Sequence, residues 1–390
     1  MLLRSAHFKT LSSYREPWVG MSSEEAAQLS DAVEEEDAGK YDRNESFAEE
    51  ALPKQSLSKD IISECISMPY RLGYGFSHAF VKLDCSDRRL SDVNILREYI
   101  HLRFVILSNN FITDISPVCV IGHLIYLKAD NNQISGAECL NPLRFLQFLD
   151  LSGNKLTTVN NLKFPLLQHL KVNENMIETF EGPWGTGFES QQLPTLHTLE
   201  ARGNKLTHLK GLGGLSSLKS IYCAENGIRQ TDGVSGLTSL VRLHLRDNRI
   251  CRLTDFTPAL SSLEYINLRG NRIKKFTTIK NLTCLPALKV LSLVDNPITN
   301  KEDYRLTVIG LLNQLQRLDK DRVTESERSE GISLVSRKDL YDDEATDSEA
   351  MEEHHNAEEG NEEMVNEGQK NVDEGEEGEG NEEEEEDEED

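Results

Sequence analysis

Residues 146–156 read LQFLDLSGNKL, and residues 240–250 and 288–298 repeat this frame as LVRLHLRDNRI and LKVLSLVDNPI. Apolar residues stand at the first, fourth, sixth and eleventh positions, and an asparagine stands at the ninth. The frame occurs nine times, with its asparagines at positions 110, 132, 154, 175, 204, 226, 248, 271 and 296. Five of the eight steps between these asparagines are 21 or 22 residues, so the period is nearly constant.

This period and this frame predict an α/β leucine-rich repeat solenoid with short 22-residue repeats. The two central leucines of each copy alternate with period two, as in a strand with one buried face. The asparagine amide can satisfy backbone groups in the turn that follows the strand. We therefore expect the strands to stack into a parallel sheet on the concave side. Unrelated leucine-rich helices would not hold an asparagine in one register nine times.

Both ends of the repeat array are predicted to be capped. A tenth, degenerate copy comes first, and Arg88 takes the place of its asparagine. Its apolar residues are Phe80, Leu83, Cys85 and Leu90. At the other end Leu315 and Leu318 begin an eleventh strand, and residues 302–318 are compatible with a closing helix. Atypical terminal repeats are usual in solenoids, because they cover the apolar ends.

Charge is distributed very unevenly along the 390 residues, whose formal net charge is −25. Residues 339–390 contain 27 acidic residues and one lysine, which gives −26. Residues 61–338 hold 34 basic and 27 acidic residues, which gives +7. A mildly basic solenoid therefore carries acidic arms, and we expect the tail to attract basic neighbours, including arginines of the solenoid itself.

This composition divides the chain into three parts. Residues 1–60 are predicted to be a disordered acidic arm, residues 61–325 the solenoid with its caps, and residues 326–390 a disordered glutamate-rich tail. Residues 1–15 can be a mitochondrial presequence, or an upstream extension if Met21 is the true start. We favour the second alternative, because an acidic arm follows at once.

Cysteine usage and hydropathy point to a chain that stays inside the cell. The seven cysteines are odd in number and form no CxxC pair, so we expect reduced and mostly buried thiols. No apolar run reaches the 18 residues of a membrane-spanning helix, so no membrane association is predicted.

One repeat carries an insertion. The step from Asn175 to Asn204 is 29 residues, and the added residues lie within 181–193, a segment with Gly and Pro. Trp184 and Phe188 in this loop have two readings that remain open. They can pack back onto the solenoid, or they can anchor a partner.

The sequence shows no catalytic motif. It contains no GxSxG, P-loop, HExxH or paired-cysteine motif, so we predict no enzyme activity, cofactor or metal site. Function is expected on the concave face, where arginine and aromatic residues gather in the second half. The candidate partner-binding residues are Arg202, Tyr222, Arg242, His244, Arg246, Tyr265 and Arg269. Such side chains dominate protein interfaces, and ordinary surface variation is the alternative. Nucleic-acid binding is not expected from +7 over 278 residues.

The segments that flank the repeats carry a more specific resemblance. Residues 75–83 (GFSHAFVKL), 96–105 (LREYIHLRFV) and 315–321 (LQRLDKD) are not repeat consensus. With the repeats, they make residues 70–325 resemble the family of leucine-rich repeat-containing protein 23. The resemblance implies a non-catalytic scaffold at the third radial spoke of motile cilia and sperm flagella. It also implies other spoke proteins as partners, no small-molecule substrate, and a place in the axonemal cytoskeleton.

Two other families share parts of this pattern. Acidic nuclear leucine-rich repeat proteins that bind histones also end in acidic tails. They have about half as many repeats and begin them almost at the N-terminus, whereas here the repeats begin near residue 80. Phosphatase-regulating solenoids use the same repeat type and are the second alternative, and an enzyme is a distant third.

Overall fold

The computed structural model describes residues 53–71, 78–182 and 185–337. Residues 1–52 and 338–390 lie outside this part, as do the two alternatives for the start of the chain. The disorder predicted for these residues stays a prediction.

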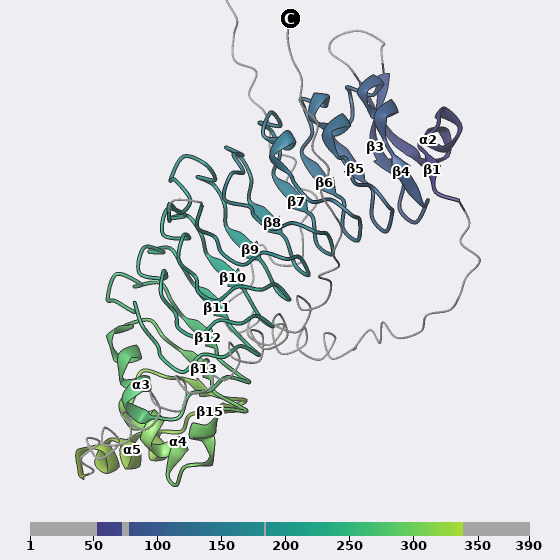
Figure 1. Cartoon of the computed structure of the whole chain (residues 1–390). Helices are drawn as coiled ribbons and strands as arrows, with labels where there is room; N and C mark the ends of the chain where they lie inside the picture. Colours follow the sequence, from purple (N-terminus) through teal and green to yellow (C-terminus); the bar gives the residue numbers. More distant parts are fainter. Residues whose placement is uncertain (1–52, 72–77, 183–184, 338–390) are drawn as a thin grey trace, which may run out of the picture. The chain divides into compact units, whose positions relative to one another are not determined.

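A thirteen-stranded sheet runs through the whole repeat array (Figure 1). Each of the nine full repeats supplies one three-residue strand, and neighbouring strands are parallel. These strands are β5 (Phe104–Ile106), β6 (Tyr126–Lys128), β7 (Phe148–Asp150), β8 (His169–Lys171), β9 (Thr198–Glu200), β10 (Ser220–Tyr222), β11 (Arg242–His244), β12 (Tyr265–Asn267) and β13 (Val290–Ser292). The predicted solenoid and its parallel sheet are thereby confirmed.

The degenerate repeats at both ends are also confirmed. Strand β3 (His78–Asp84) adds to β5 in parallel, and β14 (Arg317–Leu318) adds to β13 in parallel. Only the outermost strands, β2 (Ile66–Arg71) and β15 (Asp321–Arg322), are antiparallel within this sheet. Strands β1 (Gln55–Ser56) and β4 (Leu90–Asp92) form a separate two-stranded pair.

Short helices and turns return the chain from one strand to the next. The 3-10 helices are η1 (Asn94–Glu98), η2 (Ser116–Val120), η3 (Glu138–Leu140), η4 (Asn281–Cys284) and η5 (Pro297–Asn300). The α-helices are α2 (Lys59–Cys65), α3 (Phe276–Lys280), α4 (Tyr304–Leu311) and α5 (Glu325–Arg337). A repeat of about 22 residues leaves little room for a longer helix after its strand and turns. In the described part of the chain, no helix has the length and apolar character needed to cross a membrane.

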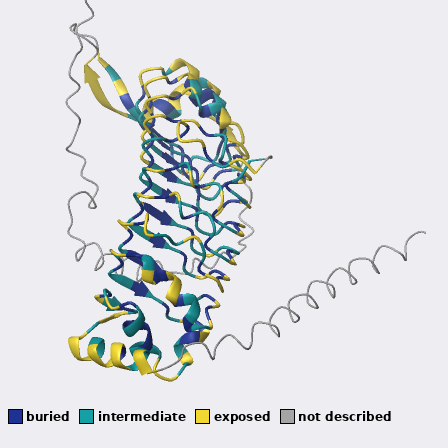
Figure 2. Ribbon diagram, turned by 90° about the vertical axis from the view of Figure 1, so that its left-hand side faces the viewer, coloured by how far each residue is buried: buried dark blue, intermediate teal, exposed yellow. Residues whose placement is uncertain are grey.

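The core is one continuous stack of repeat leucines. The paired apolar residues of each repeat, such as Leu149 and Leu151, are buried. Figure 2 shows buried residues on the strands along the length of the solenoid. Because each repeat covers the apolar side of the next, every internal repeat depends on both of its neighbours.

The repeat asparagines form a ladder that holds the turns together. The Nδ2 of Asn248 donates to the carbonyl oxygen of Cys223 in the previous repeat at 2.9 Å. It also donates to the carbonyls of Leu245 and Arg246 at 3.1 Å each. Its Oδ1 accepts from the backbone N–H of Ile228 at 3.1 Å. One amide therefore satisfies backbone groups of two repeats, which no apolar residue can do.

Two expectations about individual residues are wrong. Phe80 is not part of the core, because 49% of its surface is exposed on β3 near the edge of the sheet. The cysteines are not mostly buried either. Cys65, Cys85 and Cys223 are buried, while the other four are partly or fully exposed.

The N-terminal cap begins earlier than the predicted boundary at residue 61. Helix α2 starts at Lys59, and the hydroxyl of Ser58 caps it by accepting from the backbone N–H of Ile61 at 3.4 Å. Leu57 and Ile62 are buried and join the core. Residues 54–60 thus belong to the fold, because β1 pairs with β4 and Leu57 is buried against the core.

The C-terminal cap extends beyond the predicted boundary at residue 325. Helix α5 occupies residues that were assigned to the disordered tail, so that assignment is wrong for residues 326–337. Thr324 and Glu327 form a capping box: the Thr324 N–H donates to Glu327 Oε2 at 2.8 Å, and the Glu327 N–H donates to Thr324 Oγ1 at 3.3 Å. A β-carbon on Gly331 would lie 2.5 Å from the carbonyl oxygen of Leu306, so α5 packs on α4 through a glycine contact.

One ion pair fastens α5 to the solenoid. Arg305 Nε lies 2.6 Å from Glu327 Oε1, and the same guanidinium donates to the carbonyls of Leu318 and Arg322 at 3.2 and 3.0 Å. The hydrogen bond from Arg305, followed by that from the Thr324 backbone, lowers the pKa of Glu327 to about 2. Because the folded-state pKa is below the ordinary value of 4.5, this stabilisation is present above about pH 4.5 and is lost as the pH falls towards 2.

We expect Glu327→Gln to lower the free energy of unfolding by about 2 kcal/mol at pH 7, after allowance for partial exposure of the pair. The difference from the unmodified chain should vanish near pH 2, and urea unfolding at both pH values measures it. Glu325→Gln is the matched control, because the Glu325 side chain is 88% exposed. A Glu327 variant whose deficit is the same at both pH values would contradict the ion-pair account.

Candidate protein-interaction surface

The first and third residues of β5 to β13 point away from the core. Together with Arg202, Arg246 and Arg269, which lie two residues beyond their strands, they form one surface, here called the strand face. Cα pairing places the third residues of successive strands side by side. In chain order they are Ile106, Lys128, Asp150, Lys171, Glu200, Tyr222, His244, Asn267 and Ser292. This is the column expected from the spacing of the leucines, so the predicted register is confirmed.

The first residues of the strands form a second column, which contains an aromatic ladder in the N-terminal half. Its members are Phe104, Tyr126, Phe148 and His169, all half-buried. Tyr126 and Phe148 stack with ring centroids 4.4 Å apart. The adjoining centroid distances are 6.4 Å for Phe104 to Tyr126 and 6.2 Å for Phe148 to His169.

This aromatic ladder was missed in the sequence, although a signal was present. All four residues immediately precede the buried central residue of a strand, Val105, Leu127, Leu149 or Leu170, at the same place in the frame. Since side chains alternate in a strand, that place faces the same side as the residue between the leucines. The repeat frame therefore defines both columns. In the column of first strand residues, Arg242 and Tyr265 were predicted, whereas the aromatic residues of the N-terminal half were not.

A second aromatic group lies further along the strand face, among the predicted binding residues. His244 stacks between Tyr222 and Tyr265, with ring centroid distances of 4.5 and 4.7 Å. The Nε2 of His244 is shielded from solvent and has no hydrogen-bond partner among the described residues. Burial, with a smaller effect of Arg242, lowers the pKa of His244 to about 3, so the ring is neutral at physiological pH.

The arginines of the predicted patch are brought to this region, but most of their charge is neutralised. Three ion pairs join them to acidic residues of the turns. The pairs and their N–O distances are Arg202–Glu225 at 2.8 Å, Arg246–Asp247 at 2.8 Å and Arg269–Asp295 at 2.9 Å. The strand face therefore offers a partner oriented hydrogen-bond donors and aromatic rings, and little net positive charge.

Arg242 completes the set of predicted residues on the strand face. It is half-buried and lies beside Tyr265 on the neighbouring strand, where the two are Cα partners. Arg202 belongs to the repeat of β9 and Arg269 to that of β12, so these two arginines are three strand spacings apart, roughly 14 Å. The seven residues thus line one continuous stretch of the strand face, and their role in binding remains a prediction.

The inserted loop after Asn175 packs on the solenoid. Phe188 is 4% exposed and belongs to the core, and its backbone N–H donates to the carbonyl of Gly211 at 2.8 Å. The reading of Phe188 as a partner anchor is therefore wrong, because no apolar surface of that side chain is left for a partner. Trp184 lies outside the described residues.

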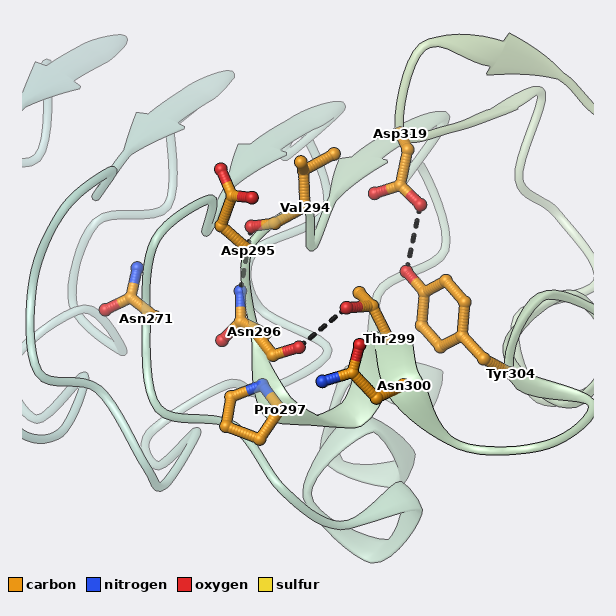
Figure 3. A pocket seen from close by; sticks show the side chains of 9 residues that line it. All are labelled: Asn271, Val294, Asp295, Asn296, Pro297, Thr299, Asn300, Tyr304 and Asp319. Carbon is orange, nitrogen blue, oxygen red and sulfur yellow. Dashed lines mark hydrogen bonds between the residues drawn. The ribbon is translucent and has the colours of Figure 1, made fainter.

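A polar pocket lies at the C-terminal end of the array (Figure 3). Tyr304 Oη donates to Asp319 Oδ2 at 3.0 Å, and the backbone N–H of Leu293 donates to Asp319 Oδ1 at 2.7 Å. In the preceding repeat, the corresponding N–H of Leu268 donates to the carbonyl of Ser292. The Asp319 carboxylate thus replaces a backbone carbonyl where the ladder ends. Asp319 and Tyr304, which line the pocket, therefore serve to end the backbone ladder.

The described residues contain no group of three or more His, Cys, Asp or Glu side chains that could hold a metal ion. The most buried acid of the strand face is Asp150, and burial raises its pKa. Its carboxylate accepts from the backbone N–H of Ser152 at 3.1 Å, so it serves the turn that follows β7.

Comparison with known proteins identifies the family. Models of the leucine-rich repeat match residues 191–341 and residues 145–165. Leucine-rich repeat-containing protein 23 of Bos taurus is 36% identical over 278 residues, which cover 71% of this chain and 79% of the bovine protein. The chain belongs to the leucine-rich repeat-containing protein 23 family.

This member of the leucine-rich repeat-containing protein 23 family is also similar to a human protein and to a solved bacterial structure. The human protein of that name is 36% identical over 289 residues, which cover 74% of this chain and 82% of the human protein. Among solved structures, an internalin of Listeria monocytogenes is similar with a TM-score of 0.43 and 22% identity, covering 66% of this chain and 85% of the internalin chain. Membership of this family and of the leucine-rich repeat fold makes the protein an interaction scaffold.

Proposed function

We propose that this protein is a non-catalytic scaffold of the axonemal radial spoke, at the third spoke, where it binds other spoke proteins and supports ciliary and flagellar motility. The observation that carries the proposal is the 36% identity to leucine-rich repeat-containing protein 23 over 278 residues. A match over 278 residues is longer than the nine full repeats, which span residues 102–298, so it extends beyond a shared repeat.

The strand face is the surface proposed to bind the spoke neighbour. The rings of its aromatic ladder, and those of Tyr222 and His244, are half-buried, and the stack is closed by the buried ring of Tyr265. Rigid aromatic side chains lose little entropy on binding and are common hot spots. The ion-paired arginines between and beside these rings supply oriented donors to a partner.

The first test concerns location. We expect the protein to sediment with axonemes from ciliated cells and to remain with them after a salt wash that removes loosely bound protein. It should be absent from non-ciliated cells. Immunoblots of the fractions, with a nuclear marker beside them, measure this. Uniform nuclear staining in ciliated cells would contradict the proposal and favour a histone-binding acidic protein.

The second test concerns the binding surface. Tyr126→Ser combined with Phe148→Ser should weaken rebinding of the purified protein to salt-stripped axonemes by roughly 30-fold or more, the effect of losing a hot spot of about 2 kcal/mol. Both side chains lie outside the leucine core, so the melting temperature should change little. Co-sedimentation at graded protein concentrations gives the dissociation constant.

Phe145→Ser is the matched control for the ladder variant. Phe145 is 48% exposed but precedes β7, outside both columns of the strand face. We expect it to bind like the unmodified chain. Reversal of Arg202, Arg246 and Arg269 to glutamate tests the second half of the strand face separately. If none of these variants weakens binding, the strand face is not the interface.

A further inference from the structure

A second charged surface runs along the turns that follow the repeat asparagines, away from the strand face. The four residues after each of Asn204, Asn226, Asn248 and Asn271 make sixteen positions, and these hold seven lysines or arginines and no acid. These seven, here called the basic edge, are Lys205, Arg229, Arg249, Arg252, Arg272, Lys274 and Lys275. The sixteen equivalent positions of the four preceding repeats hold one lysine and two acids, so the basic edge is confined to the second half.

The backbone places these residues in adjacent rows. The N–H of Arg249 donates to the carbonyl of Ile228, and the N–H of Arg272 donates to the carbonyl of Ile250, each at 2.9 Å. Gln230 and Arg252 pair as a parallel bridge in the next row. Cations of successive repeats are therefore neighbours on one surface, although they are twenty or more residues apart in sequence.

Most of these cations are exposed and unpaired. Five of them make no side-chain hydrogen bond or ion pair with any described residue. They are Lys205, Arg249, Arg252, Arg272 and Lys274, and all five are exposed. The nearby turn acids Glu225, Asp247 and Asp295 are already paired with the strand-face arginines. Neutralisation on the strand face thus leaves the positive charge on the basic edge.

We propose that the basic edge binds the chain's own glutamate-rich segment, residues 339–390. Charge complementarity is the first argument, since this segment carries 27 acids and one lysine. Reach is the second. The segment follows α5, which packs on α4 at the C-terminal end of the array. From β14 back to β9 there are five strand spacings, roughly 24 Å. The disorder predicted for these 52 residues corresponds to an end-to-end distance of about 40 Å, which covers this span.

The covalent link to the solenoid favours residues 339–390 over a separate molecule as the ligand of the basic edge. A flexibly linked segment has an effective concentration on the order of millimolar, so weak exposed ion pairs suffice to keep it near. Nucleic acid fits the surface less well. None of the sixteen positions is Phe, Tyr or Trp, whereas proteins that hold single strands combine cations with stacking aromatics.

Zero-length cross-linking of the full chain tests the proposal. A carbodiimide joins a lysine amine to a carboxylate only where the two are in contact. We expect Lys205 and Lys274 to link to residues 339–390 at 0.1 M salt. The yield should fall at least fivefold at 1 M salt, as the Debye length drops from about 10 Å to about 3 Å. Mass spectrometry of a mixture of isotope-labelled and unlabelled chains separates links within a chain from links between chains.

Charge reversal without loss of the reporting lysines gives the decisive comparison. Arg249→Glu, Arg252→Glu and Arg272→Glu together should reduce the Lys205 and Lys274 links at least fivefold. Lys155→Glu, Lys163→Glu and Lys219→Glu change the net charge equally at exposed positions outside the basic edge, and should alter these links less than twofold. If the arginine-to-glutamate variant does not fold, the corresponding glutamine variant takes its place, with an expected loss of at least twofold.

Three results would overturn the assignment. The first is equal linking of the tail to Lys155, Lys163 and Lys219, which would show only nonspecific attraction. The second is linking between chains alone, which would make a second copy the occupant. The third is loss of the links on addition of a micromolar single-stranded oligonucleotide, which would favour nucleic acid.

Discussion

A chain that ends at Leu285 should lose cooperative folding and aggregate. The truncation removes nine fully buried apolar residues of the last repeat and cap. They are Leu288, Leu291, Leu293, Ile298, Val308, Ile309, Leu312, Leu315 and Leu318. It also uncovers the side chains of the preceding repeat that packed against them, such as Ile266, Leu268 and Ile273. If about five such side chains become partly exposed, the free energy of unfolding falls by about 5 kcal/mol or more. This is comparable with the total stability of many domains.

Thermal melting followed by circular dichroism, with size-exclusion chromatography, measures this effect. A chain that ends at residue 338 is the control, because it keeps α5 and removes only the acidic segment. We expect its melting temperature to stay within a few degrees of the full chain, since exposed charge pairs contribute little to stability. Equal stability of the two truncated chains would mean that the C-terminal cap is dispensable.

The repeat frame predicted the sheet well because the same few interactions recur in every repeat. A leucine pair at fixed spacing and an asparagine at the turn specify the strand, its register and its buried side within about eleven residues. Helix α5 was harder to predict, because its capping box at Thr324 and Glu327 lies in a segment rich in charge. Its docking depends on Arg305 and on the contact of Gly331 with α4, which no local pattern reveals.

The strand face shows a different limit of prediction. The columns followed from strand alternation, but the state of the arginines depended on the turns between repeats. Glu225, Asp247 and Asp295 each precede a repeat asparagine and have positive φ angles of 54°, 53° and 58°. From this left-handed turn each carboxylate meets an arginine of the strand face. The backbone conformation of these three residues thus determines that the arginines of the strand face are neutralised, while the basic edge keeps its charge.

Replacement of one repeat asparagine should also have a large effect. Asn248→Ala removes the acceptor of the Ile228 N–H and the donor to the Cys223 carbonyl, both in the previous repeat. Asn248 is 6% exposed, so water cannot readily replace these bonds. An unsatisfied buried polar group costs about 1–3 kcal/mol, and we therefore expect the free energy of unfolding to fall by about 2–5 kcal/mol.

Urea unfolding of the full chain measures this loss, and Asn300→Ala is the matched control. Asn300 is exposed at the end of η5, so its replacement should change the free energy by less than about 0.5 kcal/mol. Because each repeat is held by its two neighbours, damage at Asn248 should also spread. Amide hydrogen exchange should rise in the flanking strands β10 and β12 before it rises in β5 or β6. A uniform rise over the whole sheet would instead show that the solenoid unfolds as one unit.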